Sequence, residues 1–171
     1  MKTIIKLNEK IIEWAKERNI DKNGTVEAQS IKTIEEMSEL IKGVCKDDIS
    51  LIKDSIGDVY VTLVILCMLK NEKIENIVNL YSKVVTPIKD KYTMLWKTSN
   101  IICFTVEKQE QKTFNEFFEQ IICDIYYTIR RIAHFYKMTL KECVKSAYDE
   151  IKNRRGKMIN GKFVKVEDMN V

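Results

Sequence analysis

Residues 29–40 read Gln-Ser-Ile-Lys-Thr-Ile-Glu-Glu-Met-Ser-Glu-Leu, and residues 53–60 read Lys-Asp-Ser-Ile-Gly-Asp-Val-Tyr. The first stretch belongs to an amphipathic helix expected over 25–44, for which Thr25 is a suitable N-cap. The second opens a helix expected over 49–69, which is apolar on all sides after its acidic start. A helix of that kind is expected to be central and buried. The predicted framework is therefore a helical bundle built on this pair.

Four carboxylates fall on the two helices. At about 100° per residue, Glu36 and Glu39 share one stripe of the first helix. Asp54 and Asp58 are four residues apart and stack on one face of the second. Burying two acidic faces against each other is costly unless a cation neutralises them. Because Mg²⁺ prefers carboxylate, water and phosphate oxygens, these acids predict a magnesium site.

Composition favours one helical domain. The chain has 171 residues, of which 45% are hydrophobic and 32% are charged, enough to build a core. One proline and five glycines leave few turns for a β-sandwich or barrel, so the fold class is expected to be all-α. The net charge of +4 is mild and does not by itself indicate a nucleic-acid partner.

The expected compartment is a reducing cytoplasm. Charged residues interrupt the N-terminus, so no signal peptide is expected, and the longest apolar run is too short to span a bilayer. The cysteines are odd in number and contain no C-x-x-C pair. We expect them to be buried free thiols; they are Cys45, Cys67, Cys103, Cys123 and Cys143.

Further helices are expected on both sides of the central pair. Helical spacing of apolar residues predicts helices over 3–18, over 73–85 with a stop at Pro87, and over 88–96. The apolar run 101–106 cannot be assigned by periodicity.

Capping and turn residues bound the C-terminal third. Thr113 and Thr139, each followed three residues later by a glutamate, resemble capping boxes that open two more helices. Gly156 is expected to end the last helix, and Asn160 with Gly161 predicts a tight turn.

The acidic pattern resembles a known signature. Glu36-Met37-Ser38-Glu39 followed by Ser55-Ile56-Gly57-Asp58 is similar to the E-x-x-E … E-x-x-D motif of the MazG-type all-α nucleoside triphosphate pyrophosphohydrolases. The chain departs from that motif at Ser55, where the family has an acid, and Asp54 is taken as the substitute.

The resemblance implies a fold and a reaction. The fold would be a MazG/dimeric-dUTPase-like helical bundle in a single domain over 1–171, with a possible insertion at 71–112 and a short extended basic tail at 157–171. The reaction would be hydrolysis of a (d)NTP to the (d)NMP and pyrophosphate. Mg²⁺, or alternatively Mn²⁺, would be held by Glu36, Glu39, Asp54 and Asp58, and the enzyme would be a homodimer or homotetramer.

Substrate contacts are expected at both ends of the chain. Lys32 is either a surface ion-pair partner of Glu36 or a phosphate contact, and the resemblance favours the latter. Trp14 is a core aromatic or, alternatively, a base-stacking residue. Residues 149–158 resemble the closing segment of phage-type MazG-like proteins, which implies that Asn153, Arg155 and Lys157 bind the triphosphate.

Two further polar residues, Asp124 and His134, were considered as members of the site. Residues 122–129 resemble residues 56–63, so a pseudo-repeat would bring Asp124 near the site, although a chance match is equally compatible. His134, the one histidine, falls near a helix end where a dipole contact accounts for it.

Other functions were weighed. The sequence has no G-x-x-x-x-G-K phosphate loop, so a P-loop NTPase is excluded. The one histidine has no partner with which it would form a Ser-His-Asp set or activate a cysteine. The basic run 152–165 suits a solvated tail or a salt-sensitive nucleic-acid contact, and specific DNA binding is not expected. A dUTPase or dCTPase of the same fold, and a catalytically degraded helical binding module, remain alternatives.

Overall fold

The computed structural model describes residues 2–80 and 88–170, and within these ranges the chain is mainly α-helical. The elements are α1 Lys2–Glu17, α2 Ile20–Asn23, α3 Val26–Lys46, α4 Ile49–Leu69, α5 Ile74–Leu80, α6 Lys91–Glu110, α7 Phe118–Phe135, α8 Leu140–Ile151, β1 Gly156–Ile159, β2 Lys162–Lys165 and the 3-10 helix Val166–Asn170. The all-α prediction is confirmed, with one small two-stranded sheet added.

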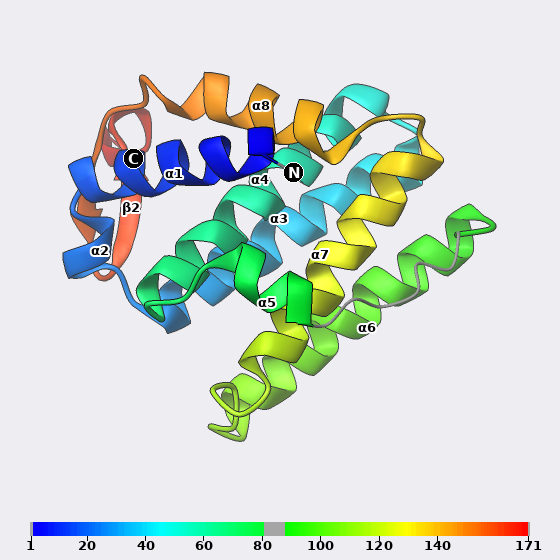
Figure 1. Cartoon of the computed structure of the whole chain (residues 1–171), viewed down its shortest axis with the longest axis horizontal. Helices are drawn as coiled ribbons and strands as arrows, with labels where there is room; N and C mark the ends of the chain where they lie inside the picture. The colour runs from blue at the N-terminus through cyan, green and yellow to red at the C-terminus, as the bar shows by residue number, and fades with distance from the viewer. Residues whose placement is uncertain (1, 81–87, 171) are drawn as a thin grey trace.

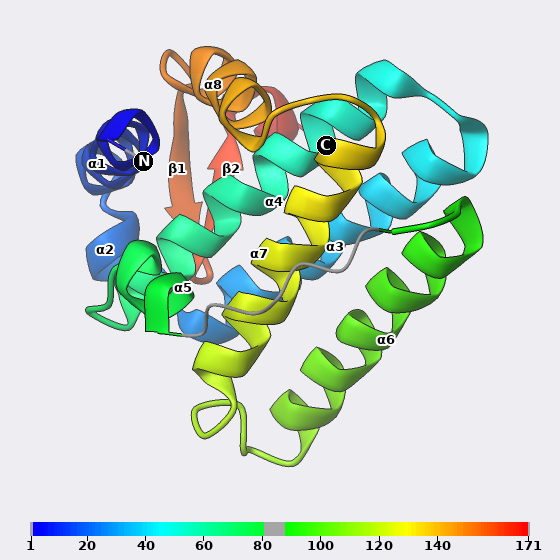
Figure 2. The same ribbon diagram turned by 45° about the vertical axis from the view of Figure 1, so that its right-hand side comes forward.

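Helix α4 runs through the middle of the molecule, as its continuous apolar sequence predicted. It packs against α3, α8, α1 and α7, and Figures 1 and 2 show these helices around it. Its residues Ile52, Ile56 and Leu63 are fully buried. Helices α3 and α4 form a hairpin across a two-residue link, in which the Asp48 carboxylate caps α4 by accepting a hydrogen bond from the Leu51 amide at 3.0 Å.

Gly57 lets α8 approach α4 closely. A Cβ atom on Gly57 would lie 2.5 Å from the Cys143 carbonyl oxygen and 2.7 Å from the Ala147 Cβ. These distances are too short for any real side chain, so a glycine is required at this crossing.

The C-terminal segment forms a hairpin instead of an extended tail. β1 and β2 are antiparallel, with Gly156 opposite Lys165, and the predicted Asn160–Gly161 turn is confirmed by positive φ angles of 49° and 77°. Gly156 was expected as the end of the last helix, which is wrong because α8 ends at Ile151 and Gly156 begins β1. A Cβ there would meet the Val164 carbonyl of the paired strand.

The outer layer differs most from expectation. Helix α6 begins at Lys91 and is continuous, so residues 91–96 of the helix expected over 88–96 and the unassigned run 101–106 belong to one element that packs on α3 and α7. Thr113 does not cap α7, which begins five residues later at Phe118, after a turn. Thr139 does cap α8, because its hydroxyl accepts a hydrogen bond from the Glu142 amide.

Two other expectations are settled in part. Helix α5 matches the start of the helix expected over 73–85, and the stop at Pro87 lies outside the described residues. The cysteines are free thiols, but Cys45 and Cys103 are exposed on α3 and α6, so burial was wrong for these two. Within the described ranges, none of the helices has the length and apolar character needed to cross a membrane.

Candidate functional site

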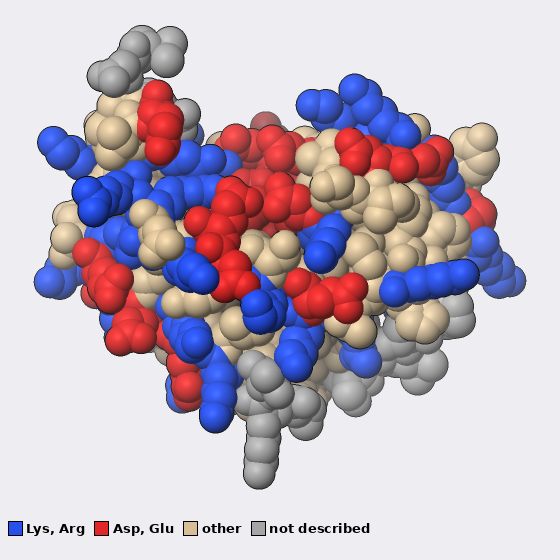
Figure 3. All heavy atoms as spheres, turned by 90° about the horizontal axis from the view of Figure 1, so that it is seen from above, with Lys and Arg blue, Asp and Glu red and all other residues tan. Residues whose placement is uncertain are grey.

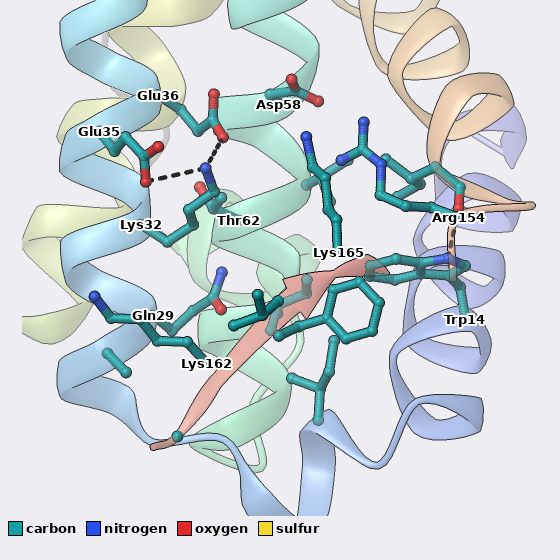
Figure 4. Close-up of a pocket in the computed structure, with 18 residues that line it drawn as sticks. Trp14, Gln29, Lys32, Glu35, Glu36, Asp58, Thr62, Arg154, Lys162 and Lys165 are labelled. Atoms are coloured by element: carbon teal, nitrogen blue, oxygen red, sulfur yellow. Dashed lines mark hydrogen bonds and ion pairs between the residues drawn. The ribbon is translucent and has the colours of Figure 1, made fainter. Parts of the chain in front are cut away.

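A cavity of about 290 Å³ lies between α1, α3, α4 and the C-terminal hairpin. Figure 4 shows the carboxylates of Glu35, Glu36 and Asp58 with Lys32 at one end and Trp14 at the other, with Arg154 beside Trp14 and Lys162 beside Gln29. The lining residues come from four separate parts of the chain and are Trp14, Ile20, Ala28, Gln29, Lys32, Glu35, Glu36, Asp58, Val61, Thr62, Ile65, Ile151, Arg154, Gly161, Lys162, Phe163, Val164 and Lys165.

The acidic end brings Glu36 of α3 against Asp58 of α4. Glu36 is only 7% exposed, and its carboxylate accepts a hydrogen bond from the Lys32 ammonium at 2.7 Å. The same ammonium lies 3.0 Å from Glu35. Burial lowers the pKa of Lys32, but contacts with Glu36 and Glu35 outweigh that effect, and the net pKa is raised. Lys32 is therefore a fixed positive charge at this end.

Asp58 has the most perturbed carboxylate of the site. Burial, followed by the negative charges of Glu36, Asp54 and Glu150, raises the pKa of Asp58 to about 7. Burial and the charges of Glu150 and Glu36 also raise the pKa of Asp54. Burial is thus the main cause of both raised pKa values, and the neighbouring carboxylates add to it.

Basic residues face the acids from the C-terminal segment. Arg154 follows α8 and Lys165 ends β2, and in Figure 4 their charged groups point toward the side of the cavity that holds Asp58. Arg154 also pairs with Glu150 on α8. Viewed over the face that carries α1 and α8, acidic side chains gather centrally with lysines and arginines beside them (Figure 3).

The opposite end is walled by aromatic and aliphatic side chains. Trp14 is 7% exposed, and its indole N–H donates to the Ile151 carbonyl at 2.7 Å. Phe163 of β2 packs edge-on against the indole at 5.6 Å between ring centres. The guanidinium of Arg18 lies 4.7 Å from the indole ring centre. Trp14 is thus both a core aromatic and part of the cavity wall.

The four predicted acids occupy three different settings. Glu36 and Asp58 line the cavity. Asp54 lies in a neighbouring surface hollow with Lys53 and Ser146. Glu39 is exposed and does not line the cavity, because it lies almost one helical turn beyond Glu36, where the part of α3 that lines the cavity ends. Ser55, which follows Asp54 on α4, is 1% exposed, and its hydroxyl has no hydrogen-bond partner among the described residues.

Of the four basic or amide residues predicted to contact phosphate, only Lys32 lines the cavity. The others, Asn153, Arg155 and Lys157, are exposed outside it. The basic residues that line it instead are Arg154, Lys162 and Lys165. The basic run was visible in the sequence, but α8 ends before it, so which of its members reach the cavity depends on how the hairpin packs.

Four other residues complete the comparison with expectation. Gln29 and Thr62 line the cavity and were not predicted, although Gln29, Lys32 and Glu36 share one helical stripe. Asp124 lies on α7 and is not part of the cavity lining, and His134 is exposed in the last turn of α7.

Comparison with known proteins gives one partial match. Residues of this chain are 44% identical over 66 positions to an uncharacterized 18.2 kDa protein from the rep–hol intergenic region of Haemophilus phage HP1. The match covers 39% of this chain and 40% of that protein, so the two are similar over about two fifths of the relative's length. No protein-family model matches the chain, and no solved structure matches it.

Proposed function

We propose that the protein is a magnesium-dependent nucleoside triphosphate pyrophosphohydrolase that converts a (d)NTP and water into the (d)NMP and pyrophosphate. The observation that carries the proposal is the polarity of the cavity. Carboxylates and ammonium groups meet at one end, and Trp14 and Phe163 wall the other. A ligand that suits both ends has a charged phosphate part and a flat, less polar part.

The donor set fits a hard cation, although within the described ranges no cluster of three or more Asp, Glu, His or Cys residues has metal-binding geometry. Glu36 and Asp58 offer only oxygen ligands, and burial, followed by the charges of the neighbouring carboxylates, raises the pKa of Asp58. Mg²⁺ bound there would screen the phosphates and favour a deprotonated water. We propose Glu36 and Asp58 as its principal ligands, with Asp54 and Glu39 added on the strength of the MazG resemblance.

The chain's own cations would position the polyphosphate. Lys32 holds an ammonium group next to Glu36, and Arg154 and Lys165 extend from the opposite wall. Arginine can grip phosphate oxygens in pairs, and lysine acts as a point charge. The partly enclosed apolar end would exclude water from the nucleoside. In this arrangement the α- and β-phosphates lie between the carboxylates and the basic hairpin.

The test is pyrophosphate release from a panel of NTPs and dNTPs, with magnesium or with EDTA. Asp58→Asn and Glu36→Gln are expected to lower turnover at least about a hundredfold, since each removes a proposed ligand of the magnesium ion. Glu107→Gln on the exposed side of α6 serves as the matched control. Release that survives in EDTA, or equal activity in the control and site variants, would refute the proposal.

The same nucleotide panel distinguishes a broad pyrophosphohydrolase from a dUTPase or dCTPase of the same fold. Turnover confined to dUTP or dCTP would identify the housekeeping activity. Turnover of many nucleotides would favour a broad pyrophosphohydrolase.

A catalytically degraded binding module is the second candidate, and Ser55 is the observation that favours it. Its buried hydroxyl stands without a partner where the resembling family has an acid. Ser55→Glu tests this candidate in a folded variant. A large gain in pyrophosphate release would indicate degradation, and no gain would favour Asp54 as the working ligand.

A homodimer or homotetramer is part of the proposal. Tyr92 and Trp96 are 68% and 69% exposed on α6, with ring centres 6.4 Å apart. Large aromatic surface of this kind is a candidate contact between subunits. Light scattering of the wild type and of Trp96→Lys measures the oligomeric state directly.

A further inference from the structure

Gln29 stands out among the residues that line the cavity. It lies near the start of α3 and is half-buried, and in Figure 4 its amide turns toward the middle of the cavity. Its backbone carbonyl accepts a hydrogen bond from the Thr33 hydroxyl at 3.0 Å. The hydrogen bonds of the described residues include none made by its side-chain amide. The cavity therefore presents an amide with a free acceptor and two free donors.

The spacing of Gln29 and Glu36 along α3 defines how far the amide lies from the carboxylates. Gln29 and Glu36 are seven residues apart on α3, which is about 10 Å along the helix axis. On α4, Ile65 lies seven residues beyond Asp58, in the same direction because the two helices are antiparallel. If the reacting phosphate of a nucleotide lies at the carboxylates, its base lies about one nucleoside length away, beside Gln29. Thr62 lies between the two ends on α4.

The walls around Gln29 suit a flat ring. Ile65 and Val61 approach from α4, and Trp14 with Phe163 closes the far side. A cavity of about 290 Å³ is at the small end of ligand sites, so it accommodates one nucleoside and not a dinucleotide. In such a setting a planar ring is held by apolar contact, and an amide at its edge supplies hydrogen-bonding selectivity.

We infer that Gln29 pairs with the hydrogen-bonding edge of the nucleobase and is the specificity-determining residue of the site. The inference rests on the proposed function for its phosphate end, and it adds the residue that selects the base. A glutamine amide pairs with two adjacent base atoms, one donor and one acceptor. Inorganic triphosphate lacks such an edge, so it leaves the amide unpaired and is a poor substrate.

The experiment separates base binding from hydrolysis. Each of the common nucleosides, without phosphate, is titrated in EDTA into the ¹⁵N-labelled wild type, Gln29→Leu and Gln111→Leu. Gln111 lies at the end of α6, outside the cavity, and is the matched control. Saturable shifts of the Gln29 side-chain amide signals are expected for the preferred nucleoside, with at least tenfold weaker binding in Gln29→Leu and unchanged binding in Gln111→Leu.

Steady-state kinetics on the nucleotide panel provide the second readout. Gln29→Leu is expected to raise KM for the preferred nucleotide at least tenfold, to change kcat little, and to flatten the ranking of bases. Nucleoside binding through Gln29 without any hydrolysis would leave this inference standing and sink the proposed reaction. If Gln29→Leu hydrolyses nucleotides with the same ranking of bases as the wild type, this inference is overturned and the proposed reaction stands.

Absence of nucleoside binding to the wild type would also overturn the inference. The wild-type amide shifts need no substitution, so the inference stays testable even if Gln29→Leu is unstable. Gln29→Met, which keeps the length of the side chain without its amide, provides a second variant.

Discussion

The Lys32 ammonium lies 2.7 Å from the Glu36 carboxylate, one helical turn away on α3, and this pair faces Asp58 across the cavity. Glu36 is nearly buried, so the ion pair differs from an ordinary solvated i,i+4 pair. Both hypotheses for Lys32 are compatible with this geometry. In the free protein it is an ion-pair partner, and in the proposed complex the same charge is close enough to bind phosphate.

Lys32→Met is expected to destabilise the metal-free protein at neutral pH by about 1–2 kcal/mol, because it leaves the Glu36 carboxylate without its counter-charge. Urea unfolding in EDTA measures the effect. Lys145→Met, which breaks an exposed pair with Asp149, is the control and should cost less than about 1 kcal/mol. Equal losses in the two variants would show that the Lys32–Glu36 pair behaves as a surface pair.

Asp58 makes stability depend on pH in a defined direction. Its pKa is raised in the folded protein from 3.8 to about 7, so the native state binds more protons than the unfolded state between these values. The stabilising contribution is full below pH 4 and is lost as the pH rises through 7. Asp58→Asn is expected to flatten this part of the stability profile and to stabilise the metal-free protein at pH 8. An unchanged slope between pH 5 and 8 would contradict the assignment.

Magnesium is expected to act in the opposite direction to protons. Under the proposed function, the cation competes with the proton on Asp58, so the shift in Tm caused by added MgCl₂ grows from pH 6 to pH 8. Glu36→Gln and Asp58→Asn should abolish the shift. Calcium-free buffers and a NaCl control of equal ionic strength separate specific binding from screening. A shift of the same size in both variants would remove these two carboxylates from the cation site.

Gly57→Ala tests the close crossing of α4 and α8. Alanine favours a helix by about 1 kcal/mol over glycine, but its Cβ would overlap the Cys143 carbonyl and the Ala147 side chain. Overpacking should prevail, with a net loss of about 1–3 kcal/mol in unfolding free energy. A more stable Gly57→Ala protein would mean that the two helices can separate at little cost.

Lys165 and Lys157 distinguish the structural assignment from the sequence-based one. They lie on paired strands of the hairpin, but Lys165 lines the cavity and Lys157 is exposed outside it. Lys165→Met is expected to raise KM for the nucleotide about tenfold or more, with a clearly smaller effect from Lys157→Met. The reverse order would restore the residue first inferred from the sequence.

Local sequence patterns were sufficient for much of the framework. The apolar run after Asp58 predicted the buried central helix, because a helix without a polar face has no stable place at the surface. The Thr139 cap and the Asn160–Gly161 turn also followed from residue chemistry over a few positions. The same patterns placed Glu36 and Asp58 on adjoining helices, and both line the cavity.

Other features depended on contacts between distant segments. Residues 97–100 carry no clear periodicity, so the continuity of α6 comes from packing on α3 and α7. Glu39 belongs to the same motif as Glu36, yet it lies beyond the part of α3 that lines the cavity and is exposed. Where the cavity ends along α3 is set by the segments that pack around it and not by the sequence of α3 alone.

The basic residues illustrate the division most clearly. The run from Lys152 to Lys165 was evident in the sequence, but Arg154 and Lys165 enter the cavity only because the chain turns after Ile151 and pairs as a hairpin. Charge and helical periodicity are properties of residues and their near neighbours, and a single chain displays them without folding. Which charges face one another, and therefore how far the pKa of Asp58 rises, depends on distances across the folded core.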